Sequence, residues 1–170
     1  IKAARCDPAA SKEYHADMEG RVEAIHIAER EGAPTFPVEE VNVVMGRGIE
    51  GDRLFNKAAE AGEDLPPHRQ LTLIEAEALE SIQRELGIEL GAGESRRNIC
   101  TRGAALNHLV DREFTVGSVR LRGIELCEPC GGLEKMTGKS GLVSALLHRA
   151  GLRAEVLESG RICVGDTLNA

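Results

Sequence analysis

The chain has 170 residues, 42% of them hydrophobic, which suffices for one hydrophobic core and excludes two domains of average size. Lysine and arginine total 21 against 28 aspartate and glutamate residues, and the net charge of −7 argues against a general affinity for nucleic acid or anionic lipid. No run approaches the ~20 apolar residues needed to span a membrane, and the N-terminus has no signal-peptide pattern. We therefore expect a cytoplasmic protein with no membrane or nucleic-acid partner.

Residues 1–20 show no sustained periodicity and are predicted to form an irregular arm before a single domain over residues 21–170. In that domain, short apolar segments alternate with glycine-rich turns, which predicts a mainly β, α+β fold: a barrel-like antiparallel sheet with peripheral helices. The predicted strands are 22–28, 38–44, 70–74, 98–100, 113–116, 118–127, 154–158 and 162–164.

Two amphipathic helices are predicted from apolar residues at helical spacing. The first covers residues 75–87 and ends at Gly87, and the second covers residues 140–151, starting at a Ser140 cap. Residues 53–62 are predicted to form a shorter third helix.

Three glycine positions predict local irregularities in the strands. The apolar phase of strand 118–127 changes after Gly123, which predicts a bulge. The turns at residues 116–119 and 164–167 have similar sequences, and we predict paired hairpin corners there.

Two glycine motifs resemble nucleotide-binding loops. The segment from Gly46 to Gly51 has the spacing G-x-G-x-x-G after a predicted strand, but the helix that follows is short and the chain does not alternate strands with helices. We favour a tight loop permitted by glycine and keep a dinucleotide-binding enzyme as a lower alternative. The sequence Gly138-Lys139-Ser140 resembles the end of a P-loop with its first glycine out of register, and it is predicted to be the start of a helix.

The segment Cys127-Glu128-Pro129-Cys130 has the clearest chemistry. The five cysteines of the chain are odd in number and scattered, which fits reduced thiols. A C-x-x-C pair places two sulfurs within reach of one metal or of each other. We favour an exposed strand-end thiolate at this segment, acting as a sulfur carrier or as a ligand to a soft, high-valent metal; for Cys6, Cys100 and Cys163 we expect small buried apolar side chains.

Two alternatives use the same C-x-x-C. A structural zinc site needs further ligands, and the sequence offers only Cys100, Cys163 and His68, without the usual zinc spacing. A thioredoxin-like redox pair has its first cysteine at a helix N-terminus, whereas the glycines at 131–132 disfavour a helix directly after Cys130.

Basic residues precede three predicted elements. Arg53 starts the short helix, His68-Arg69 leads into one strand and Arg97-Asn98 leads into another. Guanidinium groups bind phosphate and carbonyl-rich heterocycles through paired hydrogen bonds. Their value for function depends on whether folding brings them beside Cys130.

Five segments in a fixed order carry a family resemblance. They are GIEGDR at 48–53, HRQLTLIEAEALE at 68–80, SRRNICTRG at 95–103, LVDREFTVGSVRLRG at 109–123 and CEPCGGLEKMTG at 127–138. Together they resemble the MOSC domain, the C-terminal module of molybdenum-cofactor sulfurases, which also occurs as standalone bacterial proteins. The match covers roughly residues 20–168.

The resemblance implies a β-barrel-like MOSC fold and a pocket for the molybdenum cofactor (molybdopterin), a pterin dithiolene with a phosphate. It implies that Cys130, with Cys127 as second choice, is the catalytic cysteine, and that Cys130 is the metal ligand. The residues implied to bind the cofactor are Arg53, His68, Arg69, Arg97 and Asn98.

The resemblance also implies two activities. One is sulfur transfer, with a cysteine desulfurase as partner, and the other is a small molybdenum-dependent reduction of N-hydroxylated compounds, with a flavoprotein electron donor. The association of the family with pyridoxal phosphate comes from a separate domain of the sulfurases, so we expect that this chain does not itself mobilise sulfur from cysteine. The extra N-terminal region of the eukaryotic reductases is also missing from this sequence, which leaves the choice between carrier and reductase open.

Overall fold

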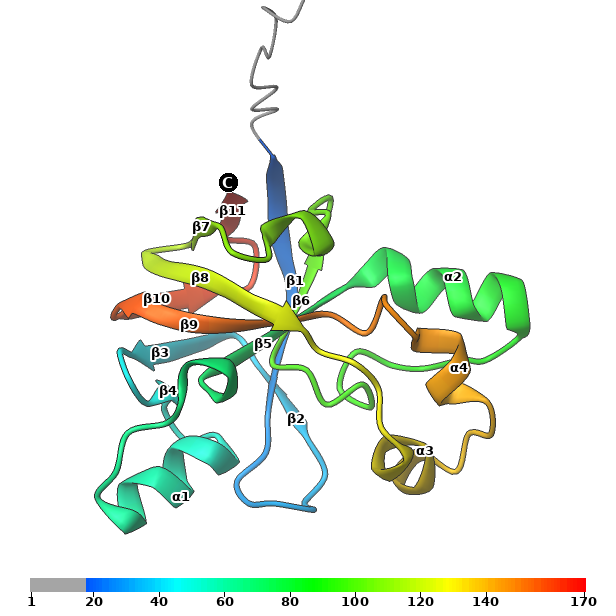
Figure 1. The fold of residues 1–170 in the computed structure, drawn as a ribbon, viewed down its shortest axis with the longest axis horizontal. Helices are drawn as coiled ribbons and strands as arrows, with labels where there is room; N and C mark the ends of the chain where they lie inside the picture. Colours follow the sequence, from blue (N-terminus) through cyan, green and yellow to red (C-terminus); the bar gives the residue numbers. More distant parts are fainter. Residues whose placement is uncertain (1–17) are drawn as a thin grey trace, which may run out of the picture.

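The structure is a computed structural model that describes residues 18–170. Seven strands form a closed barrel (Figure 1). They are β1 (Glu19–Ile27), β5 (Leu71–Glu75), β6 (Ile99–Arg102), β7 (Glu113–Val116), β8 (Val119–Leu126), β9 (Leu152–Glu158) and β11 (Thr167–Asn169). Their order around the barrel is β11-β7-β8-β9-β5-β6-β1, and pairing of β1 with β11 closes it. The predicted mainly β, barrel-like fold is confirmed.

A second, smaller sheet lies against the barrel. It contains β3 (Glu40–Val44), β4 (Gly48–Ile49) and β10 (Gly160–Cys163). A further short strand, β2 (Phe36–Val38), does not belong to this sheet but pairs with β1 of the barrel. The apolar side chains of this sheet, including Val43, Ile49 and Ile162, belong to the same buried cluster as the barrel interior. The predicted strand 38–44 is therefore two strands that pair with different partners.

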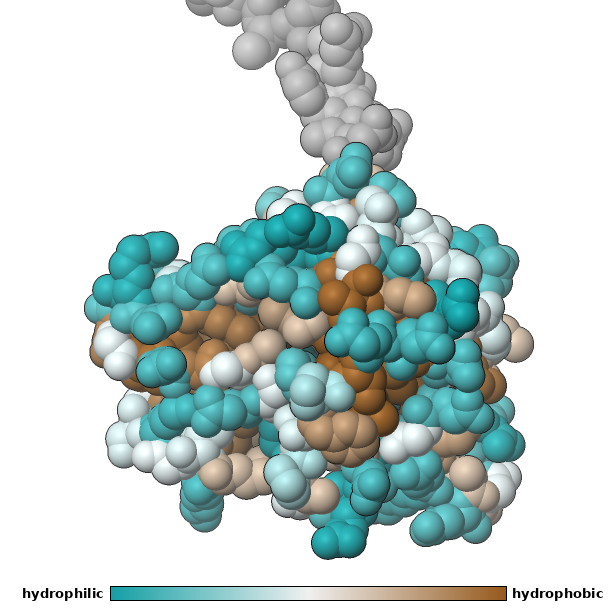
Figure 2. Space-filling view, turned by 180° about the vertical axis from the view of Figure 1, so that it is seen from behind, coloured by the Kyte–Doolittle hydropathy of each residue, from teal (hydrophilic) through white to brown (hydrophobic). Residues whose placement is uncertain are grey.

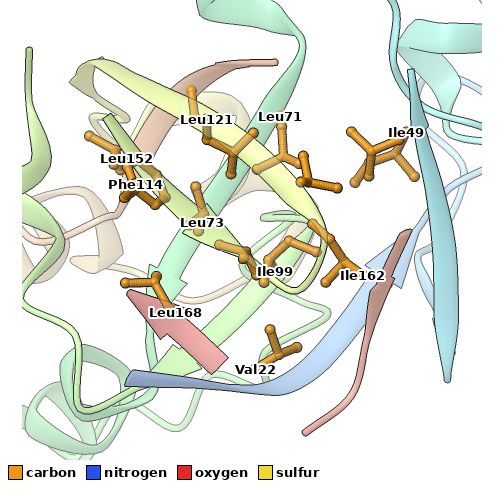
Figure 3. Packing of buried hydrophobic residues seen from close by; sticks show 14 of the residues in the cluster. Val22, Ile49, Leu71, Leu73, Ile99, Phe114, Leu121, Leu152, Ile162 and Leu168 are labelled. Atoms are coloured by element: carbon orange, nitrogen blue, oxygen red, sulfur yellow. The ribbon is translucent and has the colours of Figure 1, made fainter. Parts of the chain in front are cut away.

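The barrel interior is filled by apolar side chains from every strand, nearly all of them aliphatic (Figure 3). The strand β5 shows how the sequence pattern follows from burial on both faces. Leu71 and Leu73 point into the barrel cluster, whereas Ile74 belongs to a second apolar cluster beneath the helices. A strand covered on both faces reads as a continuous apolar run, which is the pattern of residues 70–74.

In the described part of the chain, four α-helices lie outside the barrel: α1 (Arg53–Ala61), α2 (Ala76–Leu86), α3 (Gly131–Thr137) and α4 (Leu142–Leu146). Figure 1 shows α2, α3 and α4 on one side, α1 on the other, and the β1–β2 connection between them. Strands β5 and β6 are parallel neighbours in the barrel. Parallel neighbours need a crossover connection, which is usually a helix, and α2 is that connection here. Two short 3₁₀ turns, η1 (Pro67–Arg69) and η2 (Leu106–Leu109), complete the elements.

The structure confirms several local predictions. Helix α2 ends at Gly87, which adopts the left-handed conformation expected of a helix stop, and α1 ends at Gly62 in the same way. The pairing of β8 with β9 shifts register after Gly123, which is the predicted bulge. The turn at 116–119 joins β7 to β8 as a hairpin.

Two local predictions are wrong. The predicted helix 140–151 is only the five-residue α4, which begins after Gly141 rather than at a Ser140 cap. The chain turns away after Leu146, and His148 adopts a left-handed φ of 62°, because the segment must reach the start of β9. The turn at 164–167 is not a hairpin, since β10 and β11 on either side of it belong to different sheets.

The G-x-G-x-x-G segment forms the β3–β4 hairpin rather than a dinucleotide loop. Strands β3 and β4 are antiparallel, so no β-α-β unit surrounds the glycines, and the dinucleotide alternative does not fit. Gly48 has a φ of 81°, and a Cβ at this position would lie 2.1 Å from the carbonyl oxygen of Gln70. The motif therefore reflects close backbone packing.

The surface away from the viewer of Figure 1 is polar at its rim, with hydrophobic residues gathered across its middle (Figure 2). Within residues 18–170, every helix is too short or too polar to cross a membrane.

Candidate functional site

The C-E-P-C turn, residues 127–130, leaves the end of β8 and separates the environments of its two cysteines. Cys127 is 3% exposed, and its backbone N–H donates to the carbonyl oxygen of Gly151 (2.8 Å). Cys130 is exposed and is the N-cap residue of α3. The expectation of an exposed thiol is met by Cys130, whereas Cys127 is buried because the turn packs against the chain before β9.

The helix α3 begins directly at Gly131, so the expectation that the glycine pair disfavours a helix there is wrong. The first residues of a helix have no intrahelical N–H bond to make, and glycine costs little at such positions. Packing supplies the stabilisation, since Leu133 is buried and the Glu134 carboxylate accepts the backbone N–H of Val143 (3.1 Å). The thioredoxin order is still not met, because the second cysteine and not the first lies at the helix N-terminus.

Arg97 joins the three chain segments that meet at the turn. It lies before β6, and its guanidinium donates to the carbonyl oxygens of Ala150 (2.8 Å), Ser95 (3.2 Å) and Cys127 (2.9 Å). Burial lowers the pKa of Arg97, and the ionisable sulfurs of Cys127 and Cys130 raise it. Among residues 18–170 no carboxylate forms an ion pair with Arg97, so a cation is held against the backbone of the C-E-P-C turn without a neutralising acid.

Three further arginines lie in the region of Arg97, and we call the four of them the arginine cluster. They are Arg53 at the start of α1, Arg96 beside Arg97, and Arg153 on β9. The positive charges of Arg153 and Arg53 further lower the pKa of Arg97, and burial followed by the charge of Arg53 lowers the pKa of Arg96. The cluster is thus more cationic than its two acidic contacts, Asp52 and Glu125, can neutralise.

Hydrogen bonds fix where these guanidinium groups lie. Arg53 donates to the carbonyl oxygen of Arg96 (3.4 Å), and Arg96 donates to that of Ala33 (2.7 Å). Arg153 donates to the carbonyl oxygen of His68 (3.1 Å). Arg96 also has a left-handed φ of 60°, a conformation that non-glycine residues adopt rarely and that concentrates at functional sites.

The structure places the other predicted cofactor-binding residues, Asn98, His68 and Arg69, in different surroundings. Asn98 is buried, and its Oδ1 accepts from the backbone N–H (3.3 Å) and the hydroxyl (2.9 Å) of Thr72, so it fixes the start of β6. His68 is exposed in η1 and contacts the cluster through its carbonyl oxygen. Arg69 is exposed and lines a separate shallow hollow beside α1. Their roles toward a cofactor stay predictions.

A hollow of about 500 Å³ opens beside Arg96 and α3. Its walls include His26, Thr35 and Met136. His26 Nδ1 is buried without a hydrogen-bond partner among the described residues, and burial lowers the pKa of His26, so the ring is neutral at pH 7. Cys130 is not among the residues lining this hollow, but α3, which Cys130 caps, forms one wall through Met136.

The zinc alternative finds no support within residues 18–170, where no group of three or more His, Cys, Asp or Glu residues is placed to hold a metal ion. Cys100 is buried, as expected of a small apolar side chain. Cys163 is half-buried on β10, in the small sheet, which differs from that expectation. Cys6 lies outside the described residues.

A family model for the MOSC domain matches residues 55–169, more than half of the chain. The chain belongs to the MOSC domain family. Solved structures of bacterial proteins share the fold. YuaD of Bacillus subtilis superimposes with a TM-score of 0.74 at 18% identity, covering 90% of this chain and 96% of that one. YiiM of Geobacillus stearothermophilus gives a TM-score of 0.68 at 15% identity, covering 89% and 75%. A comparison with curated proteins finds no match.

The MOSC family is associated with the molybdenum cofactor, and the donors of this site fit that group. The arginine cluster provides cations for a phosphate, and the exposed sulfur of Cys130 is a soft donor suited to molybdenum. Arg153 was missed in the sequence because it lies directly before the strand predicted at 154–158 and looks like an ordinary surface residue. Its antiparallel neighbour on β8, Glu125, is known only from the pairing.

Proposed function

We propose that this MOSC domain binds the molybdenum cofactor, with the Cys130 thiolate as the protein ligand to molybdenum. The observation that carries the proposal is the position of Arg97. This half-buried cation, without a carboxylate partner in the described part of the chain, donates to the carbonyl oxygen of Cys127 within the turn that ends at the exposed Cys130. A cationic site next to an accessible soft ligand suits an anionic metal cofactor.

In this proposal each residue has a stated task. Arg53, Arg96 and Arg153 bind the phosphate of the cofactor, because their guanidinium groups retain free N–H donors and are only partly neutralised. Arg97 and Asn98 hold the cluster in place through their bonds to backbone and to Thr72. The cofactor, when bound, supplies a molybdenum centre for redox or sulfur-transfer chemistry that amino-acid side chains do not perform.

The proposal includes two versions of the activity. As a sulfur carrier, the Cys130 thiolate attacks the outer sulfur of a cysteine desulfurase persulfide, so that a new S–S bond forms on Cys130 while the S–S bond of the desulfurase breaks and its cysteine leaves as a thiolate. As a reductase, the loaded protein cleaves the N–O bond of an N-hydroxylated compound, using two electrons from a flavoprotein and two protons, and releases the amine and water. The versions differ in whether turnover is seen when a competent electron donor is added to molybdenum-loaded protein.

The first experiment is elemental analysis of protein purified from cells that supply the cofactor. We expect molybdenum approaching one atom per chain in the wild type and a large loss in Cys130→Ser. Cys163→Ser is the matched control, since Cys163 lies on β10 in the small sheet, and it should retain the metal. Equal molybdenum in Cys130→Ser and the wild type would remove the ligand role, and stoichiometric zinc instead of molybdenum would favour the zinc alternative.

A further inference from the structure

A second set of contacts holds the C-E-P-C turn from outside. The Glu128 carboxylate accepts the backbone N–H of His148 at Oε2 (2.9 Å), and its Oε1 lies 2.8 Å from His148 Nδ1. His148 lies between α4 and β9, in the left-handed conformation. Asn107 in η2 donates to the carbonyl oxygen of His148 (2.9 Å) and so holds it from a further element.

These contacts duplicate an inner connection between the same two segments. Cys127 N–H donates to the carbonyl oxygen of Gly151, and Arg97 bridges the carbonyl oxygens of Cys127 and Ala150. The inner contacts fix the buried Cys127, which is three residues before Cys130. The contact of Glu128 fixes the turn one residue closer to the exposed cysteine.

The residue between Glu128 and Cys130 limits how far the cysteine can move relative to the anchored glutamate. Pro129 has its φ restricted by the ring, and Cys130 is in turn tied to α3 through the bond from the Leu133 N–H to its carbonyl oxygen (3.0 Å). With Glu128 anchored at one end and α3 at the other, few backbone rotations remain that move Cys130. Ordering a ligand before binding reduces the entropy lost on binding.

We infer that Glu128 and His148 are positioning residues that hold Cys130 in place for the metal, an inference that rests on the role proposed above for Cys130. The Glu128 and His148 side chains are 40% and 73% exposed, and contacts between exposed charged side chains are individually weak. We therefore expect effects of about two- to five-fold, the size typical of such pairs.

The test compares three variants in two measurements. Glu128→Ala removes the contact, Glu128→Gln keeps an amide oxygen that accepts the His148 N–H, and Glu158→Ala removes an exposed ion pair with Arg120 (2.6 Å) between β8 and β9. Hydrogen exchange of residues 127–137 is measured in cofactor-free protein, with β5 as the internal reference. The rate of molybdenum loss on dilution is measured by elemental analysis of loaded protein.

We expect Glu128→Ala to speed both exchange of residues 127–137 and loss of molybdenum by about two- to five-fold, with Glu128→Gln close to the wild type and Glu158→Ala unchanged. Unchanged exchange in Glu128→Ala would overturn the inference. So would faster exchange with unchanged metal loss, because the contact would then serve only the turn. Wild-type protein that holds no molybdenum would instead refute the proposed function, and the exchange rates alone would then decide whether Glu128 holds the turn.

Discussion

The barrel interior and the C-E-P-C turn are held together by different interactions. Leu121 and Ile99 inside the barrel are completely buried among aliphatic side chains from every strand (Figure 3). The turn is held instead by hydrogen bonds, which Arg97 donates to carbonyl oxygens and the backbone N–H of His148 donates to the Glu128 carboxylate. Apolar burial is nondirectional and tolerant of detail, whereas hydrogen bonds place individual atoms.

The contrast between the two regions shows how a stable fold carries an exposed thiol. The barrel provides most of the buried apolar surface, so the exposed Cys130 at the edge contributes little to stability. Changes in the barrel should therefore alter stability first, and changes around the turn should alter metal binding first. Measurements on single variants and single thiols can test this separation between stability in the barrel and metal binding at the turn.

The sharpest contrast concerns two thiols. Cys130 is exposed, whereas Cys100 is 4% exposed and burial raises the pKa of Cys100 to about 12. Alkylation needs an accessible thiolate, so at pH 8 Cys130 should react with iodoacetamide on the order of 10³-fold faster or more, because Cys100 must wait for the structure to open. Timed labelling with mass spectrometry measures both sites, and comparable rates would contradict the structure.

Truncating a barrel side chain should cost the most stability. Leu121→Ala removes a fully buried side chain and leaves a cavity, so we expect a loss of about 2–5 kcal/mol in the free energy of unfolding. Urea denaturation measures the loss. Leu86→Ala at the end of α2 is the control, because Leu86 is 56% exposed and its replacement should change stability by no more than about 0.5 kcal/mol.

A glycine at the border of the two regions should affect both. Gly151 has a φ of 108°, and a Cβ there would lie 1.9 Å from the carbonyl oxygen of Leu73. Backbone strain and overpacking each cost about 1–3 kcal/mol, and we expect Gly151→Ala to lose about 2–4 kcal/mol and to weaken molybdenum binding, because Gly151 accepts the Cys127 N–H. In Gly62→Ala nothing lies within 4 Å of the new Cβ. We therefore expect a loss in the free energy of unfolding from the left-handed backbone conformation alone, about 1–2 kcal/mol. Equal losses in the two variants would show that the close approach is relieved.

The smallest effect concerns an ion pair on the turn side. The Glu94 carboxylate accepts hydrogen bonds from Lys139 and from the backbone N–H of Gly91, which lower the pKa of Glu94. A carboxyl group whose pKa is lowered on folding stabilises the protein above its ordinary pKa and loses that contribution as the pH falls through the lowered value. Glu94→Gln should therefore be slightly less stable than the wild type at pH 7, and the difference should shrink below about pH 4. A difference that is constant with pH would exclude this linkage.

Local sequence patterns predicted a large part of the fold. Alternating apolar residues marked most of the strands, Gly87 marked the end of α2, and Gly123 marked the bulge in β8. These features depend on residues close in the chain. The length of α4 and the start of α3 were wrong because packing against distant segments, such as Leu133 in the second apolar cluster, outweighs the local preference.

The candidate site was predicted only in its chemistry. The sequence by itself determined that Cys130 is a thiol on a glycine-flanked turn, that arginines precede nearby strands, and that the segments of a MOSC domain occur in order. Only the tertiary structure decided that Cys127 is buried, that Arg153 joins Arg97, and that Glu128 reaches His148. The physical reason is that the sequence gives the side-chain type at each position directly. Burial, charge proximity and hydrogen bonding arise only when the strands of the barrel bring remote segments together.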